Sequence, residues 1–195
     1  METNKEAYYR ENIIEYLSQR KDDCSHDSVI NYVLKQKFLR DAIKIAVKSR
    51  DINGNKHPHQ YRIQNSLLND FSNKLNNQFE EIDKASSFEQ LFKIIEKNRI
   101  HGIGEMTIYD SAFRIGIYKG IQPDKIYLHR GTRIGVERLL GMKINKNSIT
   151  KQELPTPFNN CELNLWQLED FFCIYKDIFL HNGDSVNVTK NRWCL

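Results

Sequence analysis

The sequence has no run of eighteen apolar residues, so no segment is long enough for a transmembrane helix. Residues 1–6 lack the apolar stretch of a signal peptide, and we expect a cytoplasmic protein without a membrane partner. The four cysteines are widely spaced and form no C-x-x-C pair, which excludes a zinc or disulfide framework of the usual spacing. The net charge of +4 over 195 residues supports a nucleic-acid partner only weakly.

Sustained strand alternation, internal repeats and low-complexity segments are also missing, and the apolar residues recur at helical spacing instead. The fold class that this pattern predicts is mainly α. The expected helices cover residues 6–20, 27–49, 62–83, 88–98, 105–116, 132–140 and 163–180. The range 27–49 fits one helix or two helices broken near Lys37, with Ser25 or Asp27 as N-cap. We expect an N-terminal helical segment over residues 1–50, packed in one domain with residues 51–195.

Two glycines one residue apart, Gly102 and Gly104, separate two of these expected helices. A tight turn between helices needs positive φ, which glycine adopts without steric cost, so we expect it at both positions. The next helix then begins with free N–H groups, a favourable site for a phosphate. The sequence predicts a helix-hairpin-helix whose Gly102, Ile103 and Gly104 backbone contacts nucleic acid.

With Thr107, Ala112 and Arg114, and with an extended segment at residues 123–128, this hairpin resembles the helix-hairpin-helix DNA glycosylases of base excision repair, most closely the alkyl-base type. The similarity covers residues 60–141 or so. It implies a glycosylase-like bundle of about seven to nine helices, a DNA partner, and release of a flipped, damaged base by N-glycosidic cleavage.

The chain departs from the family at three points. The aspartate that follows the extended segment in the family is missing, and Gly131 stands near its place. Glu105 and Met106 occupy the position of the lysine nucleophile of bifunctional members, so lyase chemistry is not expected. The cysteines form no tight array for an iron–sulfur cluster, and no cofactor is predicted.

The residues that could replace the missing aspartate are His57, His59, Asp110 and His129. His57 and His59 lie in a histidine-rich segment just before a helix, which is equally typical of a polar surface loop. The candidate substrate contacts are Gln60, Arg62 and Tyr109. A His-x-His pair can ligate zinc, but its third ligand would have to come from far along the chain, as from His129, and no metal is predicted.

The candidate phosphate contacts beyond the turn are Arg114, Lys119, Arg130 and Arg133. Arg130 and Arg133 are equally typical of solvated residues at the start of a helix. Three functions remain open: a DNA glycosylase-like hydrolase, a non-enzymatic module that binds DNA structures or a protein partner, and a protein that has lost DNA binding, which Glu105 favours.

Overall fold

The computed structural model describes residues 3–19 and 27–180, and these residues are mainly helical, as predicted. The α-helices are α1 (Asn4–Gln19), α2 (Ser28–Leu34), α3 (Leu39–Lys48), α4 (Asn65–Asn76), α5 (Phe79–Lys84), α6 (Phe88–Lys97), α7 (Glu105–Tyr118), α8 (Arg130–Leu140) and α9 (Leu165–Ile174). The 3-10 helices are η2 (Pro58–Gln60), η3 (Lys151–Glu153) and η4 (Lys176–Leu180). Two short strands, β1 (Ile126–Tyr127) and β2 (Ser148–Ile149), form an antiparallel pair.

The described residues divide into two compact units. We call residues 27–124 the continuous unit, and α1 with residues 125–180 the discontinuous unit. These units divide the chain near residues 24 and 125, whereas the sequence analysis divided it at residue 50. Because α3 packs against α4 and α7, the helices before residue 50 share a core with those that follow, while α1 belongs with the C-terminal part of the chain.

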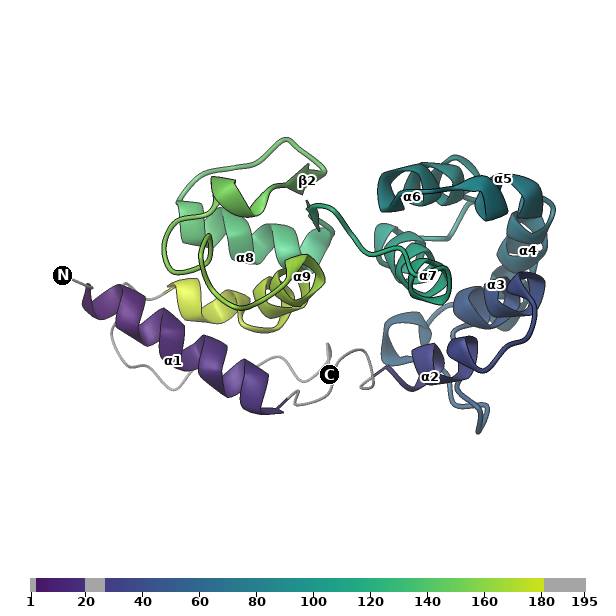
Figure 1. Ribbon diagram of the computed structural model, residues 1–195, viewed down its shortest axis with the longest axis horizontal. Helices are drawn as coiled ribbons and strands as arrows, with labels where there is room; N and C mark the ends of the chain where they lie inside the picture. The colour runs from purple at the N-terminus through teal and green to yellow at the C-terminus, as the bar shows by residue number, and fades with distance from the viewer. Residues whose placement is uncertain (1–2, 20–26, 181–195) are drawn as a thin grey trace. The chain divides into compact units, whose positions relative to one another are not determined.

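In the continuous unit, α7 packs against α2, α3, α6 and η2 (Figure 1). Nearly every residue of α7 from Thr107 to Gly116 is buried, including charged Asp110 and Arg114. A helix that is buried on all sides must provide partners for its polar side chains within the protein. This requirement shapes the candidate site described below.

In the discontinuous unit, α8 packs against α9 and η4 (Figure 1), over a core rich in aromatic rings. The core rings include Tyr9, Tyr16, Phe158, Phe171, Phe172, Tyr175 and Phe179. Gly135 permits the close approach of α8 to α9, because a Cβ at this position would lie 2.2 Å from the carbonyl oxygen of Phe172.

The helix limits follow the sequence pattern except where long ranges divide. Residues 27–49 form two helices, and the Asp27 side chain caps the first by accepting a hydrogen bond from the Val29 N–H at 2.8 Å. The helix expected over 62–83 is instead split into α4 and α5, and the end of the range 163–180 forms η4.

Within the described residues, no helix is both long and apolar enough to cross a membrane. Cys161 and Cys173 are not joined in a disulfide. Cys24, Cys194 and the alternative cap Ser25 lie outside the described residues.

Candidate functional site

The turn between α6 and α7 has positive φ at Gly102 but not at Gly104. Gly102 has φ +86°, and a Cβ there would lie 2.8 Å from Cδ2 of Leu67. Gly104 has φ −89° and is the N-cap of α7, with no atom within 4 Å of an added Cβ. The prediction of positive φ is therefore wrong for Gly104, because an N-cap residue takes an extended conformation that other residues also adopt.

The outer surface of this turn is exposed backbone with charged side chains around it. Gly102 and Gly104 are exposed, whereas Ile103 between them is buried and anchors the turn. The Nε of Arg99 donates to the carbonyl oxygen of Ile103 at 2.6 Å. The exposed charged or titratable residues between positions 96 and 105 are Glu96, Lys97, Arg99, His101 and Glu105. The first turn of α7 thus presents backbone N–H groups on a surface that also carries basic side chains, with Glu96 and Glu105 as the opposing charges.

A second feature of the continuous unit is a cluster of polar side chains between η2 and α7. The Oδ2 atom of Asp110 accepts hydrogen bonds from His59 Nδ1 at 2.9 Å and from Gln60 Nε2 at 2.7 Å. His57 caps η2, its Nδ1 accepting the His59 backbone N–H at 3.3 Å. The two imidazole rings lie edge to face with centroids 4.6 Å apart. The structure thus brings together His57, His59, Gln60 and Asp110, four residues that the sequence analysis selected separately.

Arg114 lies one turn further along α7 and is only 1% exposed. Its Nε is 2.8 Å from Asp27 Oδ2, and its Nη1 donates to Ser49 Oγ at 2.8 Å and to the carbonyl oxygen of Ala46 at 3.3 Å. These bonds tie α7 to the start of α2 and the end of α3. The prediction that Arg114 contacts DNA phosphates is corrected, because a buried guanidinium with these partners does not reach a surface ligand.

The electrostatics of the cluster favour an ionised aspartate and a neutral His57. Burial by itself raises the pKa of Asp110, but the His59 imidazole, its hydrogen bond and the Arg114 guanidinium outweigh burial and hold this pKa well below its usual range. Burial and the Arg114 guanidinium lower the pKa of His57 to about 4, although Asp110 and Asp27 act in the opposite direction. At neutral pH the cluster therefore combines a carboxylate with an imidazole whose ring nitrogen is a potential ligand or base.

The three titratable side chains also satisfy the spatial requirement for joint binding of a small ligand. One ring nitrogen each of His57 and His59 and one carboxylate oxygen of Asp110 lie within 4.8 Å of one another. The sequence analysis considered His129 as a third ligand beside the His-x-His pair, but the structure places Asp110 there. The pattern contained a usable signal, since Asp110 is an acidic residue next to apolar and small residues in the middle of α7.

His129 belongs to the discontinuous unit, apart from the other candidate catalytic residues. Its Nε2 contacts Glu169 Oε1 and lies 2.9 Å from Thr132 Oγ1, which also donates to Glu169 Oε1 at 2.7 Å. All three residues are buried. Because the hydroxyl and the carboxylate meet the same ring nitrogen, this is not a relay through opposite nitrogens of the ring. The network joins α8 to α9, and the structure supports a packing role for His129.

The other candidate contacts have varied surroundings. Arg62 is exposed next to η2, and Arg130 is exposed at the start of α8. Tyr109 is buried, and its ring packs against Phe88 and Phe113. Lys119 is half-buried and donates to the carbonyl oxygen of Asp83 at 2.5 Å. Arg62 and Arg130 are therefore the more accessible of these four.

Arg133 ties the loop after α8 to the segment before it. Its guanidinium donates to the carbonyl oxygens of Ile144, Lys146 and Leu128 at 2.7, 2.8 and 3.0 Å. These three bonds favour the structural interpretation of Arg133 over a phosphate contact.

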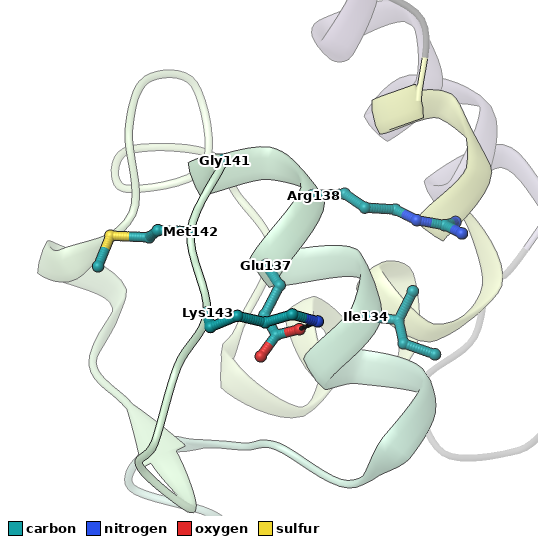
Figure 2. A pocket seen from close by; sticks show the side chains of 6 residues that line it. All are labelled: Ile134, Glu137, Arg138, Gly141, Met142 and Lys143. Carbon is teal, nitrogen blue, oxygen red and sulfur yellow. Dashed lines mark hydrogen bonds and ion pairs between the residues drawn. The ribbon is translucent and has the colours of Figure 1, made fainter.

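A surface hollow of about 440 Å³ lies at the C-terminal end of α8 (Figure 2). Figure 2 shows Glu137 and Arg138 on the helix, with Lys143 on the segment that follows. Glu137 accepts from Lys143 at 2.9 Å, and Arg138 forms an ion pair with Asp177. Because its charged groups already have ion-pair partners, the hollow offers a ligand less than the cluster on α7 does.

No protein-family model, no curated protein and no solved structure matches this chain. The function of the protein is therefore inferred from the geometry of the turn and of the cluster.

Proposed function

We propose that this protein binds DNA through the turn between α6 and α7. The observation that carries the proposal is the exposed backbone at Gly102 and Gly104, directly before the fourteen-residue helix α7. The first N–H groups of a helix have no partner within it, and together with the helix dipole they favour an anion. This contact is to the phosphate backbone, so it predicts binding without base-sequence preference.

The charges around the turn support the same ligand. Lys97, Arg99 and His101 are exposed within eight residues of Glu105, the first residue of α7. The opposing charges are Glu96 and Glu105, which are also exposed. A Glu105→Gln variant should therefore bind DNA more tightly, and the gain should shrink as salt is added.

The test is fluorescence-anisotropy binding of the full chain to single-stranded, duplex and abasic DNA at two salt concentrations. Lys97→Ala should weaken binding to all sequences alike and lower the salt slope by about one. Lys44→Ala removes the same charge from an exposed position on α3 and serves as the matched control. Gly104→Val places a branched side chain where the fold leaves open space, so it should block a phosphate and leave α7 folded. Absence of binding, or binding unchanged in both Lys97→Ala and Gly104→Val, would overturn the proposal.

A second candidate function is release of a damaged base by N-glycosidic cleavage. The observation that favours it is the His59–Asp110 pair, which supplies a carboxylate and an oriented imidazole in the same unit as the turn. An ionised carboxylate can stabilise positive charge on a sugar, the role of the aspartate absent near Gly131. Single-turnover incubation with uracil-containing and alkylated duplexes tests it, with Asp110→Asn as the inactive variant. Intact substrates would eliminate base release and leave the DNA-binding proposal standing.

A further inference from the structure

We propose that His57, His59 and Asp110 form a binding site for one divalent transition-metal ion of the zinc type. The inference is independent of DNA binding, because it depends on three side chains of η2 and α7 and not on the turn. It assigns to the chain a ligand that the sequence analysis did not predict.

The spacing of the three groups is close to that of a metal site. Their ligand atoms lie within 4.8 Å of one another, and the distance from His59 Nδ1 to Asp110 Oδ2 is 2.9 Å. In a tetrahedral site with bonds of about 2.0–2.2 Å, the ligand atoms are roughly 3.3–3.6 Å apart. The largest separation thus exceeds the tetrahedral spacing by about 1.2–1.5 Å, a difference that side-chain rotation can close.

The two elements that carry the ligands hold them in place from opposite sides. Pro58 is the first residue of η2, where its fixed φ favours the turn that brings His57 and His59 together. Asp110 is in the middle of buried α7, which packs directly against η2. All three residues lie in the continuous unit, so the site is complete within one unit.

Gln60 provides an independent sign of a ligand at this position. Its side chain is fully buried, and its Nε2 donates to the ligand atom Asp110 Oδ2 at 2.7 Å; in metal sites the ligands are commonly oriented by hydrogen bonds of this kind. Its Oε1 has no hydrogen-bond partner among the described residues. A buried acceptor of this kind destabilises the fold when it is unsatisfied, and a metal-bound water would satisfy it.

The chemistry and charge of the cluster indicate the class of metal. Two imidazoles and one carboxylate suit zinc, cobalt or iron(II), whereas magnesium and calcium prefer oxygen ligands throughout. Asp110 contributes negative charge to the site. The nearby Arg114 guanidinium opposes a cation here, and its ion pair with Asp27 reduces this repulsion.

Titration of the full, chelator-treated chain with cobalt(II), followed by visible absorption, tests the proposal. We expect one cobalt ion per chain at this site, displaced by zinc. Asp110→Asn and His59→Ala should each weaken cobalt binding at least 100-fold, as loss of one of three protein ligands predicts. His101→Ala removes an exposed imidazole and is the matched control.

The variant His59→Cys separates loss of a ligand from loss of folding. A thiolate at position 59 still binds the metal, and it should add a sulfur-to-cobalt charge-transfer band that appears only when residue 59 touches the ion. Absence of cobalt binding, or binding that is unchanged in Asp110→Asn and His59→Ala, would overturn the proposal. Because Lys97→Ala should keep cobalt binding, failure of this site and failure of DNA binding are distinguishable.

Discussion

Each unit of the molecule contains a histidine–carboxylate pair, and the two pairs differ in what surrounds them. In the discontinuous unit, His129 and Glu169 are buried, and Thr132 bonds to both of them. In the continuous unit, the His59 and Asp110 side chains are 19% and 11% exposed, and a second imidazole stands beside them. The comparison teaches that the neighbouring group distinguishes the two pairs: a hydroxyl bonded to both members completes the pair in the discontinuous unit, whereas a second potential ligand stands beside the pair on α7.

The cores of the two units also differ in the polar side chains that they bury. The discontinuous unit buries aromatic and aliphatic side chains with the His129–Glu169 pair, whereas the continuous unit buries Gln60 and the Arg114 guanidinium, which pairs with half-buried Asp27. Burying charge opposes folding unless every charge is paired. The continuous unit therefore depends for its stability on residues that also surround the candidate site.

The largest expected effect follows from removing the buried cation. Arg114→Met leaves Asp27 and Ser49 without their partner and should lower the free energy of unfolding by about 3–5 kcal/mol. In the other unit, Arg138→Met breaks a half-exposed pair with Asp177 and should cost less than about 1 kcal/mol. Urea unfolding followed by circular dichroism measures both. Equal losses would show that burial does not distinguish the two units.

A smaller effect is expected from a substitution in the buried His129–Glu169 pair. Glu169→Gln replaces the carboxylate that His129 and Thr132 share, and it should lower the free energy of unfolding by about 1–3 kcal/mol. Cobalt binding should not change, since the proposed ligands lie in the other unit. A loss of cobalt affinity in this variant would contradict the assignment of the metal to the cluster on α7.

The sequence predicted most helices and the cap at Asp27, because apolar spacing and capping are local properties. It missed the break between α4 and α5, since Leu75, Phe79 and Ile82 keep helical spacing across it. It selected His59 and Asp110 but did not predict their contact. Because α7 is buried on nearly all sides, its residue pattern does not indicate which face packs against η2. Arg114 was placed at the surface, since its partner Asp27 is 87 residues away in the sequence.

The two glycines of the turn give the next effect in order of size. Gly102→Ala places a Cβ at positive φ and against Leu67, and it should cost about 1–2 kcal/mol of stability. Gly104→Ala meets no neighbour and should cost less, through the weaker N-cap alone. Thermal unfolding of both variants checks the order. A larger loss of stability for Gly104→Ala would contradict the backbone conformation described for this turn.

The smallest expected effect concerns an exposed ion pair, the counterpart of Arg114–Asp27. The hydrogen bond from Lys146, followed by that from the Thr150 N–H, lowers the pKa of Glu153 to about 2. A carboxyl whose pKa is lower in the folded state stabilises the fold above its unfolded value near 4.3, and this stabilisation is lost as pH falls toward 2. The difference in urea midpoint between the unmodified chain and Glu153→Gln should therefore be small at pH 7 and smaller still at pH ~3. Added salt should weaken the contribution of Lys146 and spare that of the backbone N–H. A difference that stays constant between these two pH values would show that Glu153 is not held by these bonds in solution.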